Sequence, residues 1–254
     1  MAPIDLAAAA RAAESAADLA RAEILPRFRR VAVESKSDGS PVTEADRAAE
    51  RVIRDRLLAS FPDFGVLGEE FGDEGGDGPR WIIDPIDGTI GYSRGIPLFT
   101  TLIALVDGGE PILGLIDCPA FDERYVGWRG GGCRRNGVPT AVSQETDLRN
   151  AIVSHGDPYC FDRFGARETF ERMAREIPML RGYTDAFGHS QVLGGGIDAM
   201  VDLDLNPWDA AATQILVPEA GGVCHTRTCS NGKLGLIFGS PPLCDELLAM
   251  FDAE

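Results

Sequence analysis

The stretch WIIDPIDGT, residues 81–89, joins an apolar triplet to two aspartates separated by Pro-Ile. The triplet predicts a buried strand with Asp84 at its carboxyl end, and Pro85 should prevent that strand from continuing inside a sheet. Asp84 and Asp87 lie three residues apart around a tight turn, so both carboxylates can point to one place. Hard divalent cations such as Mg²⁺ prefer oxygen ligands of this kind.

Gly88 and Thr89 follow the second aspartate and offer unhindered backbone N–H groups. Such groups bind phosphate at a turn or at the start of a helix. These residues alone also fit a second interpretation, because Asp, Pro and Gly are common turn formers. On that interpretation the segment is an exposed turn with solvated acids.

Two further stretches place acids where chain elements begin or end. Glu69 and Glu70 close another apolar run, and Asp209 falls in the first turn of an amphipathic helix expected within NPWDAAATQILVPEAGG, residues 206–222. The two glutamates could simply be solvated charges at a strand end, and a carboxylate in the first turn is favoured by the helix dipole anyway. Both interpretations stay open at this point.

The overall charge limits the classes of partner. The 254 residues carry 24 Lys and Arg against 40 Asp and Glu, a formal net charge of −16. This balance argues against binding to nucleic acid or to an anionic membrane, both of which require a basic face. A small anionic substrate remains compatible, because a bound divalent cation inverts the local field.

Two features indicate the cellular compartment. The N-terminal segment contains no apolar run long enough for a signal-peptide core or a membrane span, so we expect a soluble, cytoplasmic protein. The six cysteines include no C-x-x-C pair. We therefore expect reduced cysteines, with neither a zinc site nor a disulfide framework.

The hydrophobic patterning predicts helices and strands that alternate along the chain. Thr43 is a candidate N-cap, with Asp46 as the matching carboxylate of a capping box. One compact unit of mixed α/β layers follows from this alternation. The expected helices are residues 5–28, 44–60, 163–176, 186–195, a helix starting at 208 and one from 243; short strands fill residues 66–130, followed by strands near 150–156, 178–183, 199–205 and 235–240.

Together, the motifs GEE (68–70), WIIDPIDGT (81–89) and WDAAATQILVPEAGG (208–222) resemble, in order and spacing, the signatures of the inositol monophosphatase family. These are lithium-sensitive, Mg²⁺-dependent phosphatases, and the resemblance runs from Lys36 to Gly222. It implies an αβαβα sandwich of the inositol monophosphatase/fructose-1,6-bisphosphatase type, with residues 1–254 forming one domain of two lobes, about 1–180 and 181–254. It also implies a homodimer, two or three Mg²⁺ ions per site, and inhibition by Li⁺ or Ca²⁺.

The resemblance also assigns roles to residues. The metal ligands it implies are Glu69, Asp84, the backbone carbonyl of Ile86, Asp87 and Asp209; Glu70 is a weaker candidate. Asp46 and Thr89 match the carboxylate and threonine that together orient the attacking water. Lys36, in the polar segment 35–47, matches a mobile loop that approaches the metals. The segment IGYSRG, residues 90–95, departs from the family pattern at the rim of the pocket.

The run from Arg181 to Asp209 resembles the histidinol-phosphatase branch of that family, with Thr184 and Phe187 where glycine and tyrosine are usual. A carboxylate at Asp185 suits a substrate that carries an amine. The alternative is a structural Asp185 bonded to Arg181. The implied substrate-binding residues are Glu69, Ile86, Asp87, Gly88, Thr89, Arg181, Thr184, Asp185, Ala186, Asp202 and Asp209.

The expected activity is therefore hydrolysis of a small phosphorylated metabolite by a metal-activated water, with histidinol phosphate as the first candidate substrate. Inositol-1-phosphate or a range of sugar phosphates is the alternative. A nucleotide with two phosphates is disfavoured, because no basic cluster is available for the second one. The non-enzymatic alternative is an acidic protein that only binds a divalent cation, although the spacing of an EF-hand loop is absent.

Overall fold

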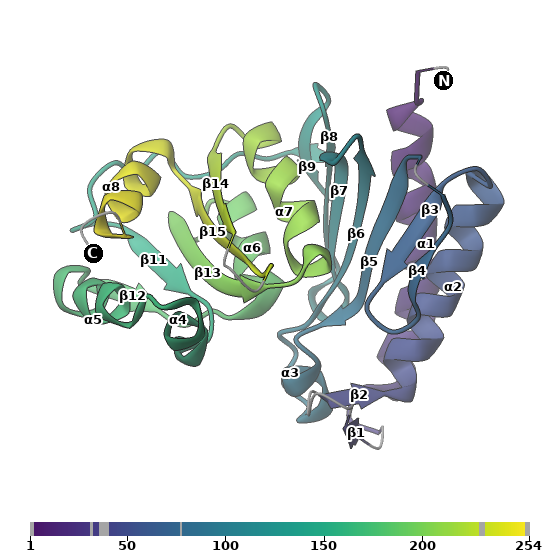
Figure 1. Ribbon diagram of the computed structural model, residues 1–254, viewed down its shortest axis with the longest axis horizontal. Coiled ribbons are helices and arrows are strands. Elements are labelled where there is room, and N and C mark those ends of the chain that lie inside the picture. The colour runs from purple at the N-terminus through teal and green to yellow at the C-terminus, as the bar shows by residue number, and fades with distance from the viewer. Residues whose placement is uncertain (1–2, 31–32, 36–40, 77, 229–231, 252–254) are drawn as a thin grey trace.

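The computed structural model describes residues 3–30, 33–35, 41–76, 78–228 and 232–251. Its first helix, α1 (Leu6–Arg27), begins at Asp5, whose side chain accepts a hydrogen bond from the N–H of Ala8 at 2.9 Å. The buried face of α1 consists mostly of alanines. Small side chains allow close approach of a neighbour, and α1 packs on α2 (Glu44–Ser60) at one side of the molecule (Figure 1).

Helix α2 confirms the capping prediction. The Thr43 hydroxyl accepts from the N–H of Ala45 at 3.1 Å, and Asp46 Oδ2 accepts from the N–H of Thr43 at 2.8 Å. The short strands β1 (Val33–Ser35) and β2 (Pro41–Thr43), which the hydrophobic pattern did not predict, form an antiparallel pair directly before this helix.

An eight-stranded sheet lies against α1 and α2. Its order is β10-β9-β8-β7-β6-β5-β3-β4, and within it only β3 and β5 run parallel. The Gly108-Gly109 turn joins β6 to β7 with both residues at positive φ, as a tight hairpin requires. The strands are β3 (Gly65–Gly68), β4 (Gly72–Glu74), β5 (Arg80–Asp87), β6 (Thr100–Asp107), β7 (Glu110–Cys118), β8 (Glu123–Trp128), β9 (Gly132–Arg135) and β10 (Val138–Pro139).

Pro85 does not end strand β5, but β5 is no longer a central strand at this residue, as expected. The strand continues to Asp87, but its pairing with β3 ends at Ile83, so beyond that point it pairs with β6 alone, with a shift in register between Asp84 and Asp87. A proline cannot donate a ladder hydrogen bond, and a register irregularity is a place where that loss is tolerated. The short helix α3 (Thr89–Ser93) follows directly, after Gly88 at φ 81°.

A second sheet of five strands has the order β12-β11-β13-β15-β14, in which β11 runs parallel to both β12 and β13. The predicted helix 163–176 is in fact two helices, α4 (Pro158–Phe164) and α5 (Arg167–Glu176). Gly165 at φ 79° caps the first and stops it. The strands are β11 (Ile152–His155), β12 (Met179–Arg181), β13 (Ala199–Leu205), β14 (Val223–Thr228), which was missed, and β15 (Leu234–Gly239).

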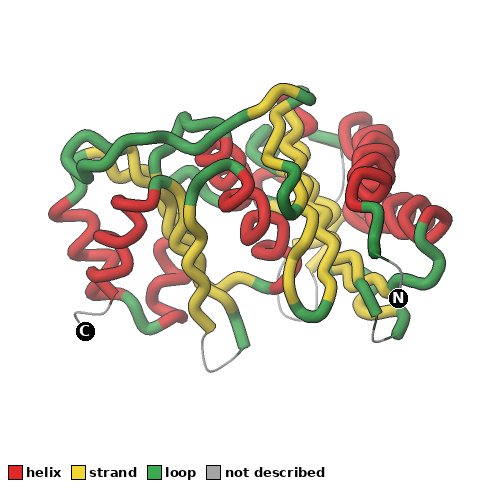
Figure 2. Tube along the Cα trace, turned by 90° about the horizontal axis from the view of Figure 1, so that it is seen from above, coloured by secondary structure: helices red, strands yellow, loops and turns green. Residues whose placement is uncertain are grey.

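Helices α6 (Asp185–Leu193) and α7 (Pro207–Glu219) fill the space between the two sheets, and α4, α5 and α8 (Pro241–Phe251) cover the outer face of the second (Figures 1 and 2). The buried side chains accordingly form three clusters: one between α1, α2 and the first sheet, one between the two sheets around α6 and α7, and one on the outer face of the second sheet. The five layers confirm the predicted αβαβα class. A single 3₁₀ turn, η1 (Pro119–Phe121), links β7 to β8.

The division into lobes differs from expectation. All strands of the first sheet end by Pro139, and the second sheet starts at Ile152. The expected boundary near residue 180 therefore falls inside the second sheet, at β12. Among the described residues, no helix is long and apolar enough to cross a bilayer. The five described cysteines are free.

Candidate active site with an acidic metal centre

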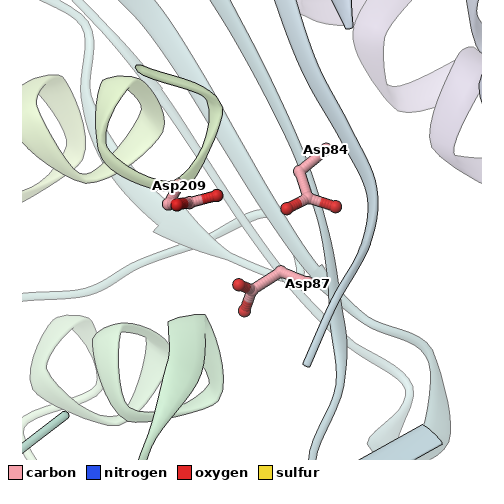
Figure 3. Close-up of side chains that lie close together, drawn as sticks. All are labelled: Asp84, Asp87 and Asp209. Carbon is pink, nitrogen blue, oxygen red and sulfur yellow. The ribbon is translucent and has the colours of Figure 1, made fainter. Parts of the chain in front are cut away.

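Three aspartates lie close together where β5 of the first sheet approaches the start of α7. Asp84 and Asp87 lie on either side of the register shift in β5, and Asp209 lies in the first turn of α7 (Figure 3). One oxygen from each lies within 4.8 Å of the others. The arrangement joins segments more than 120 residues apart in the sequence, and carboxylate oxygens at this separation can share one divalent cation.

The electrostatics of this cluster favour a cation. Burial, reinforced by the charge of Glu69, raises the pKa of Asp84 well above its ordinary value. Burial likewise raises the pKa of Asp87 strongly and that of Asp209 to about 7. Among the described residues, Asp84 Oδ1 is buried without a hydrogen-bond partner. A buried acceptor of this kind is costly unless something satisfies it, and a bound Mg²⁺ would do so.

Glu69 lines one cavity together with the three aspartates, and it lies in a turn that the buried Glu50 of α2 holds in place. Glu50 Oε2 accepts from the N–H of Glu70 at 2.7 Å, while Arg54 Nε donates to Glu50 Oε1 at 2.7 Å. A Cβ atom on Gly68 would lie 2.0 Å from Glu50 Oε1, so glycine is required there. Sequence reasoning missed Glu50; an acid on the apolar face of α2 was the available signal.

Asp209 has a second task at the start of α7. Its Oδ2 accepts from the backbone N–H of Asn206 at 2.7 Å and from the Asn206 side chain at 3.1 Å, which completes a capping box. The two hydrogen bonds to Oδ2 thus fix the orientation of the Asp209 carboxylate at the start of the helix. The group keeps its second oxygen for a cation.

Asp46 and Thr89 come together as the resemblance implied. Thr89 Oγ1 lies 3.3 Å from Asp46 Oδ1 and 2.9 Å from the carbonyl oxygen of Ile86. Burial raises the pKa of Asp46, whose other oxygen accepts from the Thr43 hydroxyl at 2.6 Å. The threonine hydroxyl therefore lies between a buried acid and a carbonyl that is itself a candidate metal ligand.

A cavity of about 730 Å³ is lined by Thr89, by Glu69 and by the three aspartates of the cluster, and it extends to residues of the second sheet. Its far wall is also acidic. The residues that line it on that side include Asp157, Asp185, Asp202 and Asp204, with Arg163 and Lys233 as basic neighbours. Such a wall suits a cationic group on the substrate.

Asp185 and Ala186 link the two walls. The backbone N–H of Ala186 donates to Asp87 Oδ2 at 2.6 Å, so this expected substrate-binding residue also fixes a candidate metal ligand. Asp185 has φ 58° and accepts from the Thr184 hydroxyl at 3.2 Å. Burial, followed by the charge of Asp202, raises the pKa of Asp185 to about 6.

Two expected substrate-binding residues lie elsewhere. Arg181 is exposed, and its Nη1 donates to the carbonyl oxygen of Leu180 at 2.8 Å. Neither Arg181 nor Thr184 lines the cavity, and Thr184 instead supports Asp185. The geometry therefore supports neither a substrate contact by Arg181 nor the alternative Arg181–Asp185 pair. Lys36 lies outside the described residues.

The sequence of this chain is similar to those of known phosphatases. Residues 2–249 match the inositol monophosphatase family. The chain is 40% identical over 213 residues to a histidinol-phosphatase of Chlorobaculum parvum, covering 83% of this chain and 81% of the relative. It is 35% identical over 220 residues to a fructose-1,6-bisphosphatase/inositol-1-monophosphatase of Aquifex aeolicus, covering 85% and 83%.

Among solved structures, an inositol monophosphatase from Zymomonas mobilis superimposes with a TM-score of 0.85 at 30% identity. The match covers 98% of this chain and 100% of that one. The similarity thus covers both sheets and all three helical layers.

Proposed function

This chain belongs to the inositol monophosphatase family, whose members are Mg²⁺-dependent phosphoric monoester hydrolases, and we propose that its substrate is histidinol phosphate. The family membership confirms the expected enzyme class. It leaves no support for the alternative of a noncatalytic cation-binding protein.

The observation that carries the proposal is the pair of carboxylates opposite the metal centre. Asp185 and Asp202 both line the cavity and are close enough for Asp202 to raise the pKa of Asp185. A neutral polyol substrate offers no positive charge to these two acids. Its binding would therefore leave two carboxylates beside an already anionic centre without a charged partner, which costs free energy. An ammonium group on the alcohol portion of the substrate would pair with them, and a charge-assisted hydrogen bond contributes about 1.5–3 kcal/mol.

The residues of the chain divide the work of hydrolysis. Glu69, Asp84, Asp87, Asp209 and the Ile86 carbonyl would hold Mg²⁺, which when bound neutralises phosphate charge and lowers the pKa of water. Gly88 and Thr89 line the cavity at the end of β5, where their N–H groups would bind the phosphate oxygens. The Thr89 hydroxyl orients the attacking water, with Asp46 positioned to take up its proton.

The proposal is tested by measuring kcat/KM for histidinol phosphate and for inositol-1-phosphate with the same enzyme. In Asp185→Asn we expect kcat/KM on histidinol phosphate to fall by about 10-fold or more, the scale of one charge-assisted bond. The loss on inositol-1-phosphate should be much smaller, because that substrate has no amine.

A matched control is available in Asp122→Asn. Asp122, like Asp185, has positive φ (54° against 58°) but lies on the surface outside the cavity. Asparagine tolerates this backbone conformation, so both variants should fold normally. Equal losses on both substrates in Asp185→Asn would indicate a structural role, and a wild-type preference for inositol-1-phosphate would refute the assignment of the substrate.

Three accompanying proposals come from the family resemblance. We expect two or three Mg²⁺ ions per site, inhibition by Li⁺ and Ca²⁺, and a cytoplasmic homodimer. Titration calorimetry gives the ion stoichiometry, inhibition assays at fixed Mg²⁺ test the two ions, and light scattering gives the oligomeric state.

A further inference from the structure

His189 is a buried histidine with both ring nitrogens engaged. It lies in α6 with 1% of its surface exposed. Its Nδ1 lies 2.7 Å from Thr213 Oγ1, and its Nε2 lies 3.0 Å from Asp202 Oδ2. The three residues come from α6, α7 and β13, so the contacts join both central helices to the second sheet.

The chemistry of the partners determines which nitrogen carries the proton. An ionised carboxylate only accepts hydrogen bonds, so Nε2 must donate to Asp202. In the neutral ring Nδ1 is then an acceptor, and the hydroxyl of Thr213 supplies its donor. The ring of Phe238 packs against the imidazole, with centroids 4.8 Å apart and planes at 70°, which holds its orientation.

Asp202 is confined from the opposite side by a glycine. A Cβ atom on Gly156 would lie only 1.9 Å from Asp202 Oδ1, so any larger residue would displace the carboxylate. Asp202 itself is 5% exposed and lines the cavity. One oxygen is thus held by His189, and the other lies in the space that Gly156 leaves.

We propose that His189 is a positioning residue that fixes the Asp202 carboxylate for pairing with the substrate's amine, and that the Thr213 hydroxyl supports the histidine tautomer that Asp202 requires. The proposal rests on the proposed function. Thr213 lies one helical turn after Asp209 on α7. Helix α7 therefore carries the candidate metal ligand Asp209 at its start and, one turn later, the threonine that contacts His189.

A double-mutant cycle tests this role. The variants are His189→Phe, Asp202→Asn and the pair together, assayed with histidinol phosphate and with p-nitrophenyl phosphate, which has no amine. His189→Phe should raise KM for histidinol phosphate by about 10-fold with little change in kcat. In the Asp202→Asn background the same substitution should change KM by less than about 2-fold, because the two residues act through one contact.

Conservative variants guard against simple loss of folding. His189→Gln keeps an N–H donor near the position of Nε2 and should recover KM to within about 3-fold of wild type. Thr213→Val removes only the hydroxyl and should weaken the tautomer preference. Thermal unfolding identifies the variants whose fold is impaired. If His189→Phe is among them, the cycle is run with Thr213→Val in its place, and the effect of Thr213→Val on KM should again shrink in the Asp202→Asn background.

A spectroscopic measurement gives an answer that does not depend on the substrate. The ¹⁵N shifts of His189 should show the Nε2–H tautomer in the wild type, and Asp202→Asn should move the Nε2 signal. An Nδ1–H tautomer, or additive KM effects in the cycle, would overturn the positioning role. If instead the wild type prefers inositol-1-phosphate while the ¹⁵N results hold, the proposed substrate fails and the positioning of Asp202 stands.

Discussion

The hydroxyl of Thr89 donates to the carbonyl oxygen of Ile86 at 2.9 Å, closer than its 3.3 Å approach to Asp46. The threonine of the residues resembling a catalytic pair therefore also bonds a backbone carbonyl that is itself a candidate metal ligand. A cation bound at that carbonyl would compete for its lone pairs. Asp46 would then become the better acceptor for the threonine proton.

Thr89→Ala should accordingly lower kcat by about 100-fold, the scale of a lost acid–base contribution, while KM changes little. Thr89→Ser keeps the hydroxyl and should recover part of the loss. Steady-state kinetics on both variants checks this. Turnover in Thr89→Ala equal to that of wild type would mean that the metal alone activates the water.

Asp87→Asn and Asp209→Asn should each abolish Mg²⁺-dependent turnover and leave the fold intact. Each removes one charge from a cluster whose members raise one another's pKa, so repulsion is relieved in the metal-free protein. Calorimetric Mg²⁺ titration and circular dichroism measure the two effects, with Asp122→Asn as the surface control. Near-normal activity at low Mg²⁺ would contradict the assignment of that ligand.

The metal-free protein should lose stability as the pH rises. The pKa of Asp209 is raised to about 7 in the fold, against about 3.9 in an unfolded chain. The folded state therefore binds the proton more tightly, and stability present below about pH 4 is lost progressively up to about pH 7. Asp185, with its pKa raised to about 6, acts in the same direction.

Thermal unfolding in chelator between pH 5 and pH 8 measures this dependence. The midpoint should fall with pH in the wild type and fall less steeply in Asp209→Asn. Added Mg²⁺ should restore the midpoint at pH 8, because the ion binds only the folded site. A midpoint that rises over this range would contradict the raised pKa values.

Asp117→Asn should destabilise the fold far more than a surface change. Asp117 is fully buried and bonds Arg21 of α1 at 2.7 Å and Arg124 of β8 at 2.6 Å. Removing its charge takes the buried partner from both arginines, which keep the exposed acids Asp122 and Asp18 respectively, and breaking a buried ion pair costs about 3–5 kcal/mol. Urea unfolding measures the loss, and Asp122→Asn, whose side chain is 91% exposed, should change stability by less than about 0.5 kcal/mol.

The layered fold and the set of acids followed from local sequence signals. Capping residues such as Thr43 and Asp46 act on neighbours within one helical turn, so both ends of that interaction are visible in the sequence. The same holds for Asp84 and Asp87, whose spacing around one turn brings their carboxylates together. The motif order then supplied Glu69 and Asp209 through resemblance.

Tertiary structure alone decided what these groups touch. The passage of β5 through Pro85 depends on β6, which pairs with β5 again at Asp87 after the pairing with β3 has ended at Ile83, and this neighbour outweighs the local preference of proline to end a strand. Asp202 meets His189 across 13 residues, and Asp117 meets Arg21 across 96. A buried polar group must find a partner wherever the packed layers place one, and the packing of whole sheets and helices sets that position.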